Sequence, residues 1–215
     1  YRTPDTKMDR PELLKQLVAA YDAELAWLDS QLERLFAELP KDTLVVIFGD
    51  HGESFKEHGW MLHGTTLFDE ETHVPLLIRL PNDSAAGTVS EESVMLLDVS
   101  PTILAQCGVR APRMQQGDDL SALWRPDAAV WSPRIVPAET KAVLEGQLLH
   151  SATLFPLKGI YSVLDARYEV FRLPDEQHLL IDAAARQAME GPLRELVGGE
   201  QFWLLQATGK GDFSA

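Results

Sequence analysis

The sequence has one cysteine, no long apolar run and few basic residues relative to its acidic ones, and each shortage excludes something. Cys107 has no second cysteine to pair with, so no internal disulfide forms. No apolar segment approaches the roughly 18 residues of a membrane-spanning helix, so no membrane span is expected. The 19 Lys and Arg against 33 Asp and Glu give a net charge of −14. This balance argues against a nucleic-acid partner, which would require clustered positive charge. It permits an anionic substrate, because a bound metal ion can reverse the local field.

The most informative stretch is residues 43–53, TLVVIFGDHGE. Its unbroken apolar run, Leu44 to Phe48, is rich in β-branched side chains and predicts a strand buried on both faces inside a parallel sheet. Asp50, His51 and Glu53 follow directly. In open α/β sheets, ligands bind beyond the carboxyl ends of the strands. We therefore predict that the chemistry of this chain lies in the DHGE turn.

Apolar periodicity extends this pattern to an α/β fold. Apolar residues recur in steps of three and four from Leu14 to Leu39, which predicts one helix over residues 11–39 that packs on one face of the sheet. The spacing also fits a coiled coil, but it covers under four heptads and leads straight into a buried strand, so the packed helix is favoured. A second strand is expected over Val74–Leu80, next to the first in one sheet.

The pattern of apolar residues changes near residue 134, where short apolar segments typical of antiparallel strands begin. We divide the chain into residues 1–133, a portion of an α/β core, and residues 134–215, a small α+β subdomain. Residues 160–164 and 168–173 are expected to form a hairpin. Further expected elements are strands at 134–136 and 141–144, helices at 181–189 and 192–197, and a helix that Asp98 caps, that contains Pro101 and that Gly108 ends.

Several short motifs accompany the DHGE turn. They are Tyr21-Asp22-Ala23-Glu24, Glu57-His58-Gly59, His63-Gly64, Leu67-Phe68-Asp69-Glu70, Val74-Pro75-Leu76-Leu77 and Leu97-Asp98-Val99-Ser100-Pro101. Each is weak alone, but the ordered set resembles the sulfatase family of the alkaline-phosphatase-like superfamily. The resemblance implies an α/β/α sandwich with a small C-terminal antiparallel sheet, and hydrolysis of sulfate esters. It leans toward a periplasmic or extracytoplasmic location.

The resemblance also implies a metal-assisted site for an anionic sulfate ester. In the family one divalent ion, commonly calcium, is held by acidic residues from two regions, and Asp50 and His51 fill the downstream pair. The imidazole shifts the preference of an oxygen-rich site from calcium or magnesium toward manganese or zinc. His63 stands where related sequences place a Lys or His that contacts the ester oxygens or the leaving group. Glu53 is expected to cap a turn, His58 to be a solvated loop residue, and Lys158 receives no role.

The chain departs from the family pattern at the nucleophile. In the family this is a formylglycine, made from Cys or Ser in a Cys-x-Pro-x-Arg-like motif upstream of DHGE. Cys107 is followed by Gly-Val-Arg-Ala and does not fit that motif. The upstream aspartate pair is missing as well. We therefore expect the chain to be the C-terminal portion of a sulfatase-like enzyme, inactive alone, with about half of the site.

Two other interpretations stay open. The same metal turn serves phosphonate and phosphate ester hydrolases and phosphoglycerol transferases of the superfamily, and the upstream nucleophile would distinguish them. Alternatively, the chain is a non-catalytic remnant that acts as a binding module. Intact upstream aspartates and a nucleophile would exclude the remnant.

Overall fold

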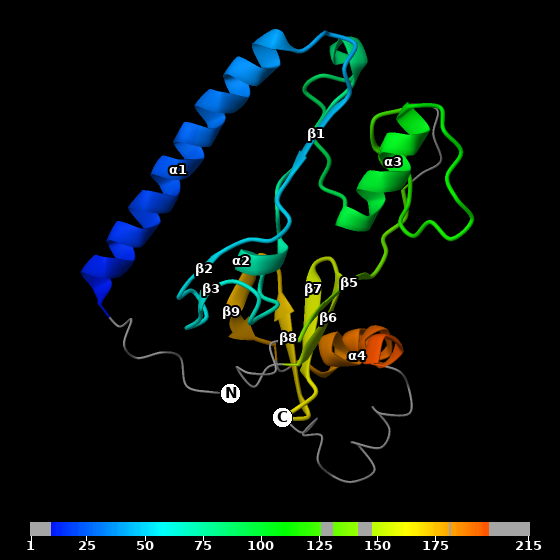
Figure 1. The fold of residues 1–215 in the computed structure, drawn as a ribbon. Coiled ribbons are helices and arrows are strands. Elements are labelled where there is room, and N and C mark those ends of the chain that lie inside the picture. The colour runs from blue at the N-terminus through cyan, green and yellow to red at the C-terminus, as the bar shows by residue number, and fades with distance from the viewer. Residues whose placement is uncertain (1–9, 126–130, 142–147, 181, 198–215) are drawn as a thin grey trace.

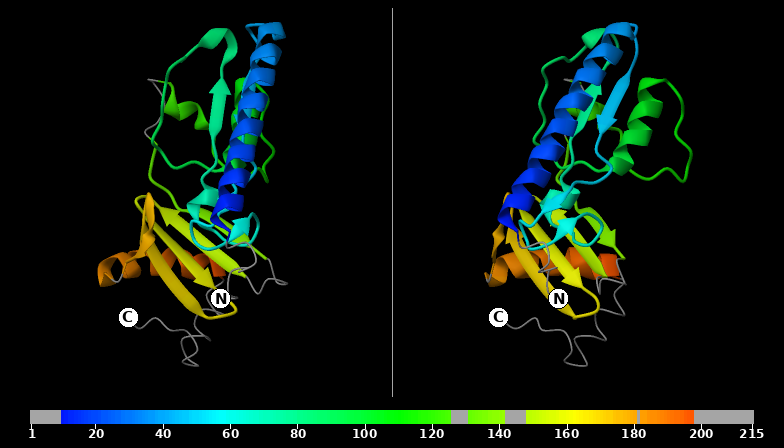
Figure 2. Two further views of the ribbon diagram at one scale, coloured as in Figure 1. Left: turned by 90° about the vertical axis from the view of Figure 1, so that its left-hand side faces the viewer. Right: turned by 60° about the vertical axis from the view of Figure 1, so that its left-hand side comes forward.

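The structure is a computed structural model that describes residues 10–125, 131–141, 148–180 and 182–197 (Figure 1). A long helix and a two-stranded sheet stand over a separate five-stranded sheet, which a C-terminal helix covers (Figures 1 and 2). The helices are α1 Pro11–Glu38, α2 Asp69–Thr72, α3 Val99–Gln106 and α4 Ala183–Val197, and 3₁₀ turns span Pro81–Asp83, Leu96–Asp98 and Leu120–Leu123. The strands are β1 Val45–Phe48, β2 Ser54–Phe55, β3 Met61–Leu62, β4 Leu76–Arg79, β5 Val136–Thr140, β6 Leu149–Leu154, β7 Leu157–Ser162, β8 Arg167–Arg172 and β9 Asp175–Leu179.

Helix α1 matches the predicted bounds, because Pro11 suits a first helical turn and Pro40 follows its last. Its last turns lie near the β1–β4 sheet, and its first turns diverge from that sheet (Figure 1). Contacts include the Tyr21 ring, 5.2 Å edge-on from Phe55, and the Phe36 ring, 5.3 Å from the Arg79 guanidinium carbon. However, α1 has no buried residue, so the expectation that its stripe packs on the sheet is wrong within this chain. Periodicity shows that a face is apolar, not that a partner covers it.

Strands β1 and β4 are neighbours in one sheet, as predicted, with Val45 opposite Arg79 and Phe48 opposite Leu76. The pairing is antiparallel, and the sheet holds two strands in the described part of the chain. Phe48 is 46% exposed and Leu77 is 58% exposed. The prediction of an interior, fully buried strand of a parallel sheet is therefore wrong for these residues, since the described residues supply no third strand to pair with β1.

The C-terminal sheet is antiparallel throughout, in the order β5-β6-β7-β8-β9. The predicted hairpin is confirmed as β7 and β8. Of the strand predicted at 134–136, only residue 136 lies in a strand, as the first residue of β5. Residue 141 of the other predicted strand is not in a strand, and residues 142–144 lie outside the described residues. The two helices predicted after residue 181 are one helix, α4, which continues through Pro192. Residue 181 itself lies outside the described residues.

Alternation along the strands gives this sheet two packed faces. Tyr161 and Val170 belong to one buried cluster with Met189 and Leu193 of α4. On the other face, residues of β6, β7 and β8 pack against the segment that enters α2; this cluster is Leu67, Phe68, Leu149, Ile160 and Phe171. Each large apolar side chain buried in this way contributes about 1.5–3 kcal/mol to folding. The second cluster fixes the C-terminal sheet against the chain that follows the DHGE turn.

Helix α3 ends at Gln106, and Gly108 then takes a φ of +66°, as its predicted stop role requires. Asp98 does not cap α3. It is fully buried, accepts hydrogen bonds from the N–H groups of Met95 and Asp118 at 2.7 and 2.8 Å, and forms an ion pair with Arg134. A buried carboxylate needs such partners more than a helix end needs a cap. None of the helices in the described part of the chain combines the length and hydropathy that a bilayer crossing needs.

Candidate active site

The DHGE turn leaves β1 beside the strand that returns as β4. The Gly49 N–H donates to the Pro75 carbonyl at 3.2 Å, which ties the end of β1 to the chain entering β4. Asp50 then points outward, with 85% of its side chain exposed, and its Oδ1 accepts a hydrogen bond from the His51 N–H at 3.0 Å. The predicted metal ligand therefore lies at the carboxyl end of β1, as the sequence led us to expect.

The contacts of the His51 ring determine which of its nitrogens carries the proton. Its Nδ1 lies 2.9 Å from the Gly52 carbonyl, and because a carbonyl only accepts, Nδ1 carries the proton. Nε2 then presents its lone pair 3.8 Å from Asp50 Oδ1. Metal-binding histidines in proteins commonly donate their other ring N–H in this way. The bond to Gly52 raises the pKa of His51, burial opposes it, and Asp50 and Glu53 add to the rise.

His63 lies against His51, as two stacked rings with centroids 3.9 Å apart and planes 27° apart. Its Nδ1 is 3.2 Å from Glu53 Oε2 and donates to that carboxylate. Glu53 therefore orients His63, and its predicted role as a turn cap is wrong. The structure thus gathers Asp50, His51 and His63, from two separate loops, at one surface site. The donor set of one carboxylate and one correctly oriented imidazole fits a divalent ion.

Beneath this site lies Glu71, which the sequence analysis did not single out. It is 5% exposed, and its carboxylate accepts hydrogen bonds from Ser54 Oγ at 3.0 Å, Thr66 Oγ1 at 2.8 Å and Gly64 N–H at 2.7 Å. Its carbonyl accepts from the Gly52 N–H at 2.8 Å. These bonds join α2 to both loops of the site. The acidic run 69–71 was the available signal, but nothing local showed which carboxylate is buried.

A second group of charges joins α2 to the C-terminal sheet. Lys158 is 1% exposed in its side chain, and its Nζ lies 2.7 Å from Asp69 Oδ1, 2.9 Å from Thr72 Oγ1 and 3.1 Å from Glu176 Oε1. Glu176 Oε2 accepts from the Asp69 N–H at 2.5 Å. Burial raises the pKa of the Glu176 carboxyl, and Lys158 opposes that rise. Lys158 therefore holds the two parts of the chain together, a role the sequence analysis did not assign.

His58 belongs to the same interface, so the prediction of a solvated loop residue is wrong. Its ring stacks on Phe68 with centroids 3.6 Å apart; Nδ1 lies 2.8 Å from Glu70 Oε1 and Nε2 lies 3.2 Å from the Glu176 carbonyl. Ligand atoms of His58, Glu70 and Glu176 come within 4.8 Å of one another, close enough for a metal ion. We assign an ionic interface instead, because Lys158 already supplies the cation and both ring nitrogens face acceptors.

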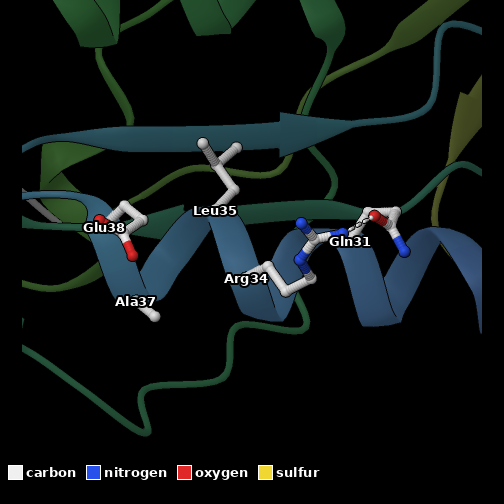
Figure 3. A pocket seen from close by; sticks show the side chains of 5 residues that line it. All are labelled: Gln31, Arg34, Leu35, Ala37 and Glu38. Atoms are coloured by element: carbon white, nitrogen blue, oxygen red, sulfur yellow. Dashed lines mark hydrogen bonds between the residues drawn. The ribbon is translucent and has the colours of Figure 1, made fainter.

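Two hollows lie elsewhere on the molecule. One, of about 500 Å³, is bounded by the last turns of α1 (Figure 3), and its lining residues are Gln31, Arg34, Leu35, Ala37 and Glu38. The other, of about 440 Å³, lies along β4, the 83–94 loop and Trp124. Neither is lined by Asp50, His51 or His63. The side chains of Asp50, His51 and His63 are 85%, 46% and 47% exposed, so the candidate site lies open on the surface of the described part of the chain.

A comparison with protein families decides the identity. The family model described as Sulfatase matches residues 1–109 of the 215. The chain belongs to the sulfatase family. An N-acetylglucosamine-6-O-sulfatase of Bacteroides thetaiotaomicron is 32% identical to this sulfatase chain over 111 residues, which is 49% of the chain and 20% of that enzyme. The chain therefore spans about a fifth of this relative.

Solved structures show the same fold over nearly the whole sulfatase chain. BT1596, a 2-O GAG sulfatase, matches with a TM-score of 0.70 and 17% identity, covering 97% of this chain and 46% of that one. The phosphonate monoester hydrolase SpPMH from Silicibacter pomeroyi matches with a TM-score of 0.68 and 20% identity, covering 90% and 43%. These neighbours confirm the predicted fold class, an α/β fold shared with a solved sulfatase. The sulfatase chain spans less than half of each.

Proposed function

We propose that this sulfatase chain carries the downstream half of a metal-assisted site for sulfuric ester hydrolysis. Asp50 and His51 are the metal ligands, and His63 contacts the ester. The observation that carries the proposal is the shared geometry of the three side chains. Asp50 Oδ1 and His51 Nε2 are 3.8 Å apart, the Gly52 carbonyl sets the His51 tautomer, and the His63 ring stacks on that of His51.

Asp50 and His51 would hold one divalent ion, calcium by family resemblance, with magnesium, manganese and zinc as alternatives. Bound there, the ion would neutralise anionic ester oxygens and stabilise charge that develops in the transition state. The further ligands and a formylglycine nucleophile would come from a part of the enzyme outside these 215 residues. This follows from the missing Cys-x-Pro-x-Arg-like motif and accords with the small share of each relative that the chain spans.

His63 acts on the ester next to these ligands. Because Nδ1 donates to Glu53, Nε2 is the nitrogen that can donate to, or protonate, an ester oxygen. His51 must be neutral to ligate a metal, so the stacked pair need not hold two positive charges. The chain thus supplies a neutral ligand and a proton donor side by side.

A phosphonate or phosphate ester is the second candidate substrate. It is kept because the same metal turn serves both kinds of ester, and because histidine, as at His51, is a known variant within the superfamily where the family often has asparagine. The fold likeness to SpPMH is compatible with it. Both reactions would use the same downstream residues, and the upstream nucleophile would decide between them.

The test is turnover by the full-length enzyme of an aryl sulfate and of an aryl phosphonate monoester. We expect the sulfate to be preferred, and His63→Gln to lower kcat by about 10²–10⁴-fold, the usual contribution of a general acid. His73→Gln is the matched control, because His73 is exposed and lies outside the site. Preference for the phosphonate would favour the second candidate. Turnover of neither ester would indicate the non-catalytic binding module.

A further inference from the structure

The carboxylate of Glu71 lies beneath both loops of the candidate site. The Glu53–His63 pair bridges these loops, and the chain next to each member is bonded to Glu71. On the first loop, Gly52 and Ser54 flank Glu53, and they bond the carbonyl and the carboxylate of Glu71 at 2.8 and 3.0 Å. On the second loop, Gly64, which follows His63, bonds the same carboxylate at 2.7 Å.

We propose that Glu71 is a positioning residue of this site, which fixes the His63 ring on the His51 ring without touching substrate or metal. A carboxylate suits this role because one group accepts several hydrogen bonds at once, from two hydroxyls and a backbone N–H here. Its 5% exposure keeps water from replacing those donors. Loss of the carboxylate would leave the donors of two loops without a common acceptor, so the loops would separate.

The local packing agrees with this role. A Cβ on Gly52 would lie 2.0 Å from the Glu70 carbonyl oxygen, so the DHGE turn sits directly on the backbone of α2. Helix α2 is in turn held by Lys158 through Asp69 and Thr72. Glu71 therefore connects the two loops to a helix that is itself held in place. This role rests on the proposed function, but the contact between the His51 and His63 rings can be tested without an activity measurement.

The experiment is a ring-to-ring NOE measurement between His51 and His63 in full-length protein with labelled histidines, assigned with His51→Gln and His63→Gln. At a centroid separation of 3.9 Å the wild type should show the NOE. Glu71→Ala should lose it. Glu71→Gln should keep it, because the amide oxygen can accept from Gly64 while the NH₂ donates to rotated hydroxyls. Glu169→Ala removes a buried carboxylate of the C-terminal sheet and should keep the NOE.

The kinetic arm is aryl sulfate turnover by the same variants. Glu71→Ala should lower kcat by about 10²-fold with little change in KM, the effect of small misplacement of a reacting group. Glu71→Gln should restore most of it. A folded Glu71→Ala that keeps the NOE overturns the proposal; a wild type that shows the NOE but no turnover contradicts only the proposed function. If Glu71→Ala does not fold, Ser54→Ala/Thr66→Val decides: a weakened NOE supports the proposal, and an unchanged NOE overturns it.

Discussion

Replacing Lys158 by methionine should destabilise the protein more than any surface charge change. The Lys158 side chain is 1% exposed, and its ammonium group pairs with Glu176, whose side chain is 3% exposed, and with Asp69. Methionine retains most of the apolar stem but leaves Glu176 without its cation in a buried position. Removing one partner of a buried ion pair costs about 3–5 kcal/mol. That is a large share of a total stability of about 5–15 kcal/mol.

The assay is urea unfolding of Lys158→Met, followed by tryptophan fluorescence, beside Lys141→Met as the control. Lys141 pairs with Glu139 on the surface, with side chains 65% and 56% exposed, and its loss should cost at most about 1 kcal/mol. The double variant Lys158→Met/Glu176→Met removes the carboxylate that Lys158→Met leaves unpaired. It should therefore recover part of the free energy of unfolding that Lys158→Met loses. Equal urea midpoints for Lys158→Met and Lys141→Met would refute the assigned ionic interface.

Three further predictions concern the turn, the buried carboxyl and the chain by itself. Gly52→Ala should lower the free energy of unfolding by about 1–3 kcal/mol, because its Cβ would meet the Glu70 backbone at 2.0 Å. The control Gly191→Ala, in helix α4 with nothing within 4 Å, should raise it by about 0.5–1 kcal/mol. Burial raises the folded pKa of Glu176 above 4.5. Its contribution to stability is therefore full below the unfolded pKa and is lost as pH rises through the folded value. In urea titrations across this range, Glu176→Gln should gain stability relative to wild type as pH rises, and a constant difference would contradict the shift. Residues 1–215 alone should show no aryl sulfate turnover and little calcium affinity by calorimetry. Turnover that His51→Gln abolishes would show that the site is complete within this chain.

Local sequence patterns predicted where helices and strands lie better than they predicted strand direction and side-chain burial. Two short apolar runs with turn residues around them predicted β1 and β4 as neighbours. The runs could not show that the strands are antiparallel or half exposed, because apolarity does not report direction or cover. The hairpin of β7 and β8 was predictable because its strands and turn are contiguous. Strand β9 was not predicted, since its residues 175–179 are mostly polar.

The same limit applies to the site. Asp50 and His51 were selected because they follow an apolar strand, and His63 because of the family resemblance. The three do lie together, although their roles stay predictions. The supports were missed because they depend on distant partners. Asp69 and Glu176 are bonded across 107 positions, and the burial of Glu71 depends on donors from two loops. No local pattern distinguishes such a carboxylate from a solvated one, so burial and contacts had to come from the structure.

Metal content, measured together with sulfate-ester turnover in the full-length enzyme, tests the central claim most directly. The wild type, purified without chelator and analysed by inductively coupled plasma mass spectrometry, should retain one divalent ion per chain, as the family resemblance implies. Asp50→Ala should lose the ion and the turnover together, whereas His73→Gln should keep both. An Asp50→Ala enzyme that retained its metal and its turnover would contradict the assignment of the DHGE turn as the metal site.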